Sequence, residues 1–406
     1  MANILVIGKY YPPFEGGIET YTRDVCEMLA SRHQVVAVVY NHEHGRREEL
    51  INGVRVIRCS RQGNIRGQPI AFGMVSAIAL EDVDLVHFHA PNFFSNAILL
   101  LKMMACKRHI PVVVTHHMEV YGRRLLRRLA MPFYRNLVRR SAAVIVTSEK
   151  NAALSADLPA NASTVAIPLG IDPEEFVLSD SERAAARVWK RRMAGDSQTV
   201  AFIGRHARYK GLAVLTRATA QIPGVHALIA GEGPYQASAR ELAAVLGVAD
   251  RVHFLGPISK QQKKFLLGAC DVFALPSTEI TEAFGVSLLE AMAAGIPIVA
   301  SDLPTGVSDL AIGGETALVA PPGDARALAG CIKRVLSDPG LADRLRDRAR
   351  KLVVERFSKA SVLEQTRDLI ERHLPDYAPS ASVDGAPRAE RIPARERVSA
   401  REMEEV

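Results

Sequence analysis

Short, continuously apolar runs rich in valine and isoleucine alternate with helical stretches, and this alternation occurs twice along the chain. In the first half the runs lie at residues 3–8, 34–40, 54–59, 85–90, 111–117 and 142–148. In the second half they lie at 199–205, 226–233, 251–258, 271–277, 296–302 and 317–323. Strands that are apolar throughout are covered on both faces, as in a parallel sheet between helices. The pattern predicts an α/β fold with two doubly wound parallel-sheet domains.

Length and turn-forming residues divide the chain. A sequence of 406 residues is too long for one ordinary hydrophobic core. Turn formers concentrate in AIPLGIDPEEF at 166–176, which we expect to connect an N-terminal domain (1–168) to a C-terminal domain (169–359). The carboxyl ends of both sets of strands would line a central cleft, where such sheets bind ligands. Residues 378–406 contain almost nothing to bury, and we expect a disordered tail.

Composition limits the class of protein. The net charge of +7 and the pI of about 9.2 favour anionic partners such as phosphates or acidic lipids, although a positive balance also serves solubility alone. Five scattered cysteines without metal-ligand spacing are typical of reduced thiols in a cytoplasmic protein. No apolar run reaches the roughly 18 residues of a membrane span. The first apolar run lacks a preceding basic region and a cleavage site, so it is interpreted as a strand and not as a signal peptide.

Two loops have the chemistry to hold a phosphate group. Gly16 and Gly17 follow the first predicted strand and precede a helix, where backbone N–H groups and the helix dipole attract anions. In FIGRHARYKGL, Arg205 and Lys210 follow a strand that ends near Gly204, and two fixed cations there suit a diphosphate. An ordinary glycine turn and a solvated basic loop remain the alternatives.

Three further strand ends are polar or rich in glycine. The sequences LIAGEGP (228–234) and HFLGPIS (253–259) could give main-chain contacts to a nucleobase, or could be tight turns. In TEAFGVSLLEAMAAG (281–295), a helix is predicted from Val286 to Ala294, with Glu282 in the loop before it and Glu290 in its early turns. Carboxylates accept hydrogen bonds from sugar hydroxyls and a ribose diol, and a polar ligand would explain their position. Solvation of Glu282 and a local pair for Glu290 are equally compatible.

These pieces together resemble the family 4 retaining glycosyltransferases, which have the GT-B fold of two Rossmann-like domains. The resemblance rests on EAFGVSLLEAMAAGIPIVASDLP, in which seven residues separate the two glutamates, and on GGIE, IPLGID, GRHARYKG, GEGP and FLGPIS in the family's order. It covers roughly residues 1–375. The family also implies that a C-terminal helix, about 360–375, crosses back to the N-terminal domain.

The resemblance implies a role for each matching residue. Glu290 would bind the donor ribose, and Glu282 would hold the transferred sugar with the amides near Phe284 and Gly285. Arg205 and Lys210 would clamp the diphosphate and stabilise it as the leaving group. Other donor contacts would come from Gly16, Gly17, Gly231, Gly233, Leu255 and Val286. His117, in VVVTHHMEVYG, matches a histidine near the anomeric centre, and Glu119 and Tyr121 are assigned to the acceptor side.

The implied activity is transfer of a hexose from a nucleotide diphosphate sugar to a lipid-linked or polysaccharide acceptor, with retention. The donor preference is mannose from GDP-mannose, then glucose from UDP-glucose. The family needs no metal and no cofactor, and Asp82-Val83-Asp84 is interpreted as a chance match to a metal-binding motif because it leads directly into a strand. A nucleotide-sugar epimerase and a non-catalytic nucleotide-sugar binding protein remain alternatives.

Arginine pairs alternate with apolar residues at helical spacing in residues 121–142. Such a helix can lie on an anionic membrane, which would place the enzyme peripherally at the inner face. A solvated basic face over a core stripe is the alternative. Nucleic-acid binding is not expected, because the basic residues gather at the predicted diphosphate site and on this one helix.

Overall fold

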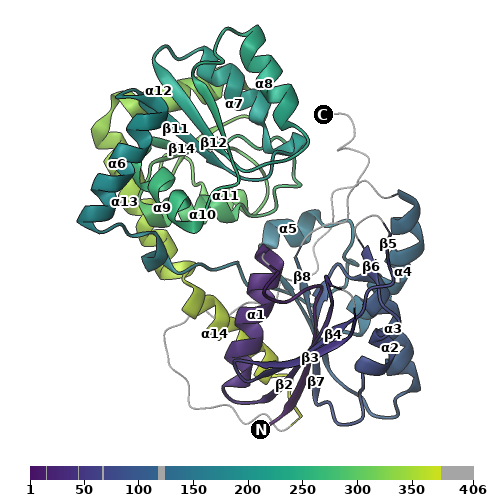
Figure 1. Ribbon diagram of the computed structural model, residues 1–406. Helices are drawn as coiled ribbons and strands as arrows, with labels where there is room; N and C mark the ends of the chain where they lie inside the picture. Colours follow the sequence, from purple (N-terminus) through teal and green to yellow (C-terminus); the bar gives the residue numbers. More distant parts are fainter. Residues whose placement is uncertain (15, 44, 66–67, 118–123, 376–406) are drawn as a thin grey trace. The chain divides into compact units, whose positions relative to one another are not determined.

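The computed structural model describes residues 1–14, 16–43, 45–65, 68–117 and 124–375. The described part of the chain forms two compact units, one comprising Met1–Pro168 with residues 362–375, and the other Leu169–Ser361 (Figure 1). Each unit has its own sheet and its own hydrophobic core. The predicted disordered tail, 378–406, lies outside the described residues.

The N-terminal unit is built on an eight-stranded sheet with the order β10-β9-β8-β7-β1-β2-β4-β3. Its strands are β1 (Asn3–Ile7), β2 (Gln34–Tyr40), β3 (Arg47–Ile51), β4 (Val54–Cys59), β7 (Leu85–Ala90), β8 (Val112–His116), β9 (Ala143–Val146) and β10 (Thr164–Ala166). A separate antiparallel hairpin consists of β5 (Gly63–Ile65) and β6 (Gln68–Ile70). All six runs predicted as strands in this half are strands, and they pair in parallel.

Strand β3 is the exception to the predicted parallel sheet, because it pairs antiparallel with β4 at the sheet edge. Its sequence, REELI, is mostly charged and its side chains are exposed or half-buried. A strand with a neighbour on one side only does not need two apolar faces, so it has no hydrophobic signal in the sequence. Its charge also protects the edge from pairing with other chains.

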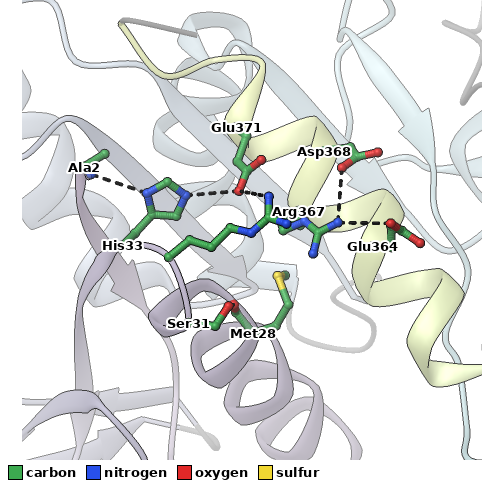
Figure 2. A network of polar contacts seen from close by, with 9 residues as sticks. Ala2, Met28, Ser31, His33, Glu364, Arg367, Asp368 and Glu371 are labelled. Carbon is green, nitrogen blue, oxygen red and sulfur yellow. Dashed lines mark hydrogen bonds and ion pairs between the residues drawn. The ribbon is translucent and has the colours of Figure 1, made fainter. Parts of the chain in front are cut away.

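Helices of the N-terminal unit are α1 (Gly17–Ala30), α2 (Met74–Ala77), α3 (Phe93–Ala105), α4 (Arg124–Arg140) and α5 (Glu149–Leu154). The last helix of the chain, α14 (Lys359–Glu371), has most of its length in this unit. Figure 2 shows one of its attachments: His33 Nδ1 accepts from the Ala2 amide at 3.4 Å, and His33 Nε2 is 3.1 Å from Glu371 Oε1. Since the amide occupies Nδ1, the ring donates to Glu371 through Nε2–H.

The C-terminal unit contains a six-stranded, fully parallel sheet with the order β13-β12-β11-β14-β15-β16. Its strands are β11 (Gln198–Ile203), β12 (Val225–Ala230), β13 (Val252–Gly256), β14 (Val272–Leu275), β15 (Ile298–Ser301) and β16 (Leu318–Ala320). The helical elements are η1 (Pro173–Phe176), α6 (Asp180–Ala194), η2 (Arg208–Lys210), α7 (Leu212–Ala220), α8 (Gln236–Val245), α9 (Lys260–Ala269), α10 (Val286–Ala294), α11 (Val307–Leu310), α12 (Ala325–Ser337) and α13 (Pro339–Arg356).

The continuous apolar runs of this half are explained by two core clusters. Along β14, Phe273 and Leu275 belong to the cluster that includes α9 and α10, whereas Val272 and Ala274 belong to the cluster that includes α7, α8 and α12. Successive side chains of a strand point to opposite faces, so a sheet covered on both sides needs apolar residues at every position. All six strands predicted in this half are present.

Candidate active site

Four neighbouring strands of the C-terminal unit end at one edge of the sheet, and the predicted donor residues follow these ends. Arg205 follows β11, Gly231 follows β12, Leu255 lies at the end of β13, and Glu282 lies between β14 and α10. The strand order reverses between β11 and β14. The loops after two such strands diverge to opposite faces of a doubly wound sheet and leave a ligand-binding crevice. The predicted residues are therefore gathered at the edge where this fold binds ligands.

Lys210 and Glu282 form an ion pair at this reversal point. Lys210 Nζ lies 2.6 Å from Glu282 Oε2, and the two side chains are 12% and 7% exposed. Ser277 donates a hydrogen bond to the same carboxylate oxygen at 2.8 Å, and Thr305 donates to the Glu282 backbone carbonyl at 2.8 Å. The loop carrying Glu282 is thus held by its side chain and its backbone. A cation and a carboxylate are fixed side by side.

Glu290 has a different partner from Glu282. It lies on α10, and its Oε1 atom is 2.7 Å from Nζ of Lys263 on α9. Burial raises the pKa of Glu290, and the neighbouring Lys263 opposes that rise. The sequence left open whether Glu290 binds a ligand or pairs locally. The structure has the local pair, which leaves the second carboxylate oxygen as a further acceptor.

Two glycines at this edge have backbone conformations that exclude other residues. Gly231 has φ of +116°, and a Cβ atom there would lie 2.0 Å from the Gly204 carbonyl oxygen. Gly285, the residue before α10, has φ of +81°, and its Cβ would lie 3.0 Å from a methyl group of Leu275. At Gly231 the absence of a Cβ lets the chain after β12 pack against the backbone of Gly204. Gly285 lets the chain turn into α10, and the first amides of that helix follow it.

The basic loop after β11 has two exposed arginines, Arg205 and Arg208, and one buried histidine. Arg205 is exposed, whereas His206 is fully buried, and its backbone N–H donates to the Glu232 carbonyl at 2.8 Å. The amide of Tyr235 donates back to the His206 carbonyl at 3.0 Å. These bonds join the loop to the turn that contains Gly233. Arg205 is thus presented to solvent from a rigid base.

The remaining predicted donor residues differ in what they can offer. The Phe284 ring is buried, with its centroid 5.9 Å from the Phe357 ring, so this residue can contact a ligand mainly through its backbone. Val286 is 37% exposed, and Leu255 is half-buried. The predicted contact of a ligand with the amides near Phe284 and Gly285 remains a prediction.

In the N-terminal unit, the paired glycines lie at the start of α1. Gly16 precedes the helix in an extended conformation, and no atom would lie within 4 Å of a Cβ at Gly17. The turn before them is held by Arg58 on β4, whose large side chain is buried. The Arg58 guanidinium donates to the backbone carbonyls of Tyr11 at 3.0 Å and of Pro12, and it contacts Glu49 on β3 at 2.5 Å.

His117 follows β8 and is part of a chain of imidazoles. Its Nε2 atom lies 2.9 Å from Nδ1 of His89 on β7, and the two rings are stacked. Tyr21 on α1 meets both rings edge-on, and its hydroxyl is 3.2 Å from Thr366 on α14. Burial, followed by the neighbouring histidines, lowers the pKa of His117 to about 3. The histidine is therefore neutral at physiological pH.

Several residues of the site were not predicted from the sequence. They are Ser277 and Lys263, which contact the two glutamates, Arg58, which holds the turn before Gly16, and His89, which contacts His117. Only His89 had a visible signal, because His87 and His89 are separated by one residue in a predicted strand and therefore share a face. Arg58 and Lys263 depend on pairings between segments far apart in the sequence, whereas Ser277 contacts Glu282 within one loop, and that contact depends on how the chain after β14 folds.

Two predicted residues, Glu119 and Tyr121, lie outside the described residues.

Asp84, part of the sequence match to a metal-binding motif, accepts a hydrogen bond from the Asn3 amide at 2.9 Å and pairs with Arg108. This structural role fits the interpretation of that motif as a chance match. Among the described residues, no group of three or more histidine, cysteine or acidic side chains could hold a metal ion. Within the same ranges, no helix has both the length and the apolar character needed to cross a bilayer.

Family models match both halves of the chain. The model described as Glycosyltransferase Family 4 matches residues 15–175. The model described as Glycosyl transferases group 1 matches residues 186–352. Together they include the loops described above, apart from residues before position 15.

Curated relatives span most of the chain. O-antigen chain mannosyltransferase C of Escherichia coli is 26% identical over 369 residues, covering 90% of this chain and 96% of the relative. D-rhamnosyltransferase WbpZ of Pseudomonas aeruginosa is 30% identical over 266 residues, covering 65% and 67%. A GDP-mannose-dependent alpha-(1-6)-phosphatidylinositol monomannoside mannosyltransferase of Mycobacterium tuberculosis is 26% identical over 321 residues, covering 74% and 81%.

Solved structures with the same fold include a sucrose-phosphate synthase from Thermosynechococcus elongatus, with a TM-score of 0.73 and 24% identity over 92% of this chain and 99% of that one. Anabaena Alr3699/HepE in complex with UDP has a TM-score of 0.74 and 21% identity over 92% of this chain and 100% of that one. These similarities establish the GT-B fold that the sequence predicted.

Proposed function

Because this chain belongs to the group 1 and family 4 glycosyltransferases, we propose that it transfers a hexose from a nucleotide diphosphate sugar to a lipid-linked or polysaccharide acceptor, with retention of configuration. The observation that carries this proposal is the buried Lys210–Glu282 pair at the reversal point of the C-terminal sheet. It supplies a fixed cation for a departing phosphate beside a carboxylate that accepts from sugar hydroxyls.

The residues of the C-terminal unit act on the developing charges. Breaking a glycosyl–phosphate bond builds negative charge on the diphosphate, and Lys210 and the exposed Arg205 oppose it. Preorganised cations and helix-terminal amides stabilise such charge without reorganising during the reaction. Glu282 and the amides at Phe284 and Gly285 hold the transferred sugar, and Glu290 holds the ribose. Main chain at Gly231 and Gly233, with Leu255 and Val286, completes the donor site.

The N-terminal unit would supply the second half of the reacting centre. Gly16 and Gly17 offer backbone amides at the start of α1 to the diphosphate, and His117 lies near the anomeric carbon. Since side chains provide the positive charge, we propose that neither a metal nor a cofactor is needed. Turnover in excess chelator tests that expectation.

The donor that we propose to test first is GDP-mannose, followed by UDP-glucose. Support for mannose comes from the relatives, because the Escherichia coli protein is named a mannosyltransferase and the Mycobacterium tuberculosis protein is named GDP-mannose-dependent. Their names, O-antigen chain and phosphatidylinositol monomannoside, also support a polysaccharide or lipid-linked acceptor.

The basic helix α4 supports a peripheral membrane location. Leu129 and Phe133 are 64% and 54% exposed on it, while Met131 and Tyr134 are buried in the core. The exposed face also carries Arg128 and, at the helix end, Arg139 and Arg140. Apolar side chains flanked by arginines suit the interface of an anionic bilayer. We therefore propose that the enzyme works at the inner face of a membrane.

Thermal-shift measurements with a panel of nucleotide sugars test the donor, because a ligand that binds only the folded state raises the melting temperature. We expect a nucleoside diphosphate and the corresponding nucleotide sugar to raise the melting temperature. Product analysis with a lipid-linked saccharide then tests transfer, and the anomeric configuration of the product tests retention. Release of free nucleotide that does not depend on an acceptor would contradict the proposed transfer.

A further inference from the structure

Thr22 is a buried threonine on α1 whose hydroxyl proton has a defined acceptor. Its Oγ1 atom donates to the backbone carbonyl of Ile18 at 2.8 Å, one turn earlier in the helix. A hydroxyl has one proton and two lone pairs. With the proton used, Thr22 presents only a lone pair to its other neighbour, Nδ1 of His89 at 3.3 Å.

That lone pair decides the protonation of His89. An unprotonated Nδ1 would face the Thr22 oxygen lone pair to lone pair, so Nδ1 carries the proton. His89 is 2% exposed, and its Nε2 atom is buried without a hydrogen-bond partner among the residues that the structure describes. A proton on Nε2 would therefore be buried without an acceptor, which is costly. The surroundings of both ring nitrogens therefore favour the tautomer of His89 with its proton on Nδ1.

The same N–H reaches His117. His89 Nδ1 lies 2.9 Å from His117 Nε2, closer than it lies to Thr22. Since His89 is the donor, His117 Nε2 must be the acceptor, and the proton of a neutral His117 is on Nδ1. The low pKa of His117, caused first by burial, keeps the ring neutral.

We infer that Thr22 and His89 are positioning residues that fix His117 as the neutral tautomer with its proton on Nδ1. This inference rests on the proposed function, in which His117 lies beside the transferred sugar. It assigns His117 the role of a hydrogen-bond donor to an oxygen of the substrate through Nδ1–H, with Nε2 engaged by His89. Helix α1, which begins at the proposed diphosphate-binding glycines, thus also sets the protonation of the histidine.

Nitrogen NMR on full-length protein labelled with ¹⁵N-histidine tests the inference without turnover, because protonated and unprotonated imidazole nitrogens resonate far apart. His89→Asn and His117→Gln identify the signals. We expect both rings to have the proton on Nδ1 in the wild-type protein. A wild-type His117 with its proton on Nε2 overturns the inference, whatever the enzyme transfers.

Variants of Thr22 test the consequence for catalysis. Thr22→Val removes the lone pair. We expect the tautomer of His117 with its proton on Nε2 to predominate and kcat to fall about tenfold, since most molecules then lack the hydrogen bond to the substrate in the transition state. The donor KM should change less than twofold, and Thr22→Ser should restore the wild-type spectrum and rate. A Thr22→Val spectrum identical to the wild type overturns the role of Thr22.

The matched control is Thr216→Val. Thr216 is fully buried in α7 and donates to the carbonyl one turn earlier, at Leu212, at 2.8 Å, and within the described part of the chain it has no hydrogen bond to a histidine. The Thr216→Val variant should lose the same kind of helix hydrogen bond as Thr22→Val, without altering the His117 signals. If no nucleotide sugar is turned over, the proposed function fails, and the wild-type spectrum still decides the tautomer.

Discussion

Lys210 Nζ lies 2.6 Å from Glu282 Oε2 at the position in the C-terminal sheet where the strand order reverses. They come from loops 72 positions apart in the sequence, and each is nearly buried. Two unpaired charges at this depth would be costly, whereas each neutralises the other here. The pair therefore keeps a cation and a carboxylate ready at the ligand-binding edge before any ligand arrives. Stability and function depend on the same two side chains.

Removing one partner should destabilise the protein more than removing both. We expect Lys210→Met or Glu282→Gln to cost about 3–5 kcal/mol, because a buried charge or polar group loses its partner. The double variant should lose less stability than the sum of the losses in the two single variants. Calorimetric melting of the four proteins gives the coupling. Strict additivity would show that the pair is not an energetic unit.

Glu290→Ala should weaken nucleotide binding. If the carboxylate accepts hydrogen bonds from the ribose diol, its loss should raise the Kd of the nucleoside diphosphate about tenfold, or about 1.4 kcal/mol. Glu282→Ala should lower turnover more than it weakens nucleotide binding, because Glu282 is proposed to hold the sugar. Titration calorimetry gives both affinities, with the exposed Glu241→Ala on α8 as control. Unchanged affinity in Glu290→Ala would refute the ribose assignment.

The largely buried Glu290 carboxyl group also predicts a pH dependence of stability. Burial raises its pKa above the ordinary value of 4.5 in the folded state. The folded protein therefore holds this proton more tightly than the unfolded chain, and the stabilisation present below pH 4.5 is lost as the pH rises through the folded pKa. Glu290→Gln abolishes the titration, so the melting temperature of the variant relative to wild type should climb over this interval.

The difference in melting temperature between Glu290→Gln and the wild type should level off once Glu290 is ionised. Melting curves from pH 4 upward measure this difference. A difference that falls with increasing pH would mean that Lys263 outweighs burial and lowers the pKa instead.

The sequence predicted the parallel sheets because burial on two faces requires apolar residues at every position, as in β14. It could not predict β3, whose exposed charged residues satisfy no such requirement. Likewise, the positions of Arg205 and Lys210 after a strand were visible as a local pattern. Their surroundings were not, because the partner of Lys210 comes from another strand end, and a pairing of that kind depends on the order of the strands.

The tertiary partners also changed the interpretation of individual residues. Glu290 was compatible with a ligand or a local pair, and only the packing of α9 against α10 brings Lys263 to it. For His117, the sequence suggested a position near the sugar but not a protonation state. That state depends on Thr22 and His89, which lie on α1 and β7.

Arg58 should control the turn that leads to Gly16. Arg58→Met removes donors to two backbone carbonyls and leaves Glu49 without its partner, so we expect a loss of about 3–5 kcal/mol of stability and a higher donor KM. Arg55→Met is the matched control, because Arg55 lies on the same strand and pairs with Glu48 of β3 while exposed. Exposed pairs contribute about 0–1 kcal/mol. Equal losses in the two variants would contradict the anchoring role.

Exposed apolar residues on α4 should contribute to membrane binding. We expect Leu129→Ser with Phe133→Ser to reduce co-sedimentation with vesicles of anionic phospholipid several-fold, because both side chains are more than half exposed between arginines and would enter the bilayer interface. Val188→Ser is the control: Val188 is 53% exposed on α6, which also carries arginines. If α4 is only a solvated basic face, the double variant and the control will bind equally. Binding to neutral vesicles should be weak for all, since the arginines then lack an anionic surface.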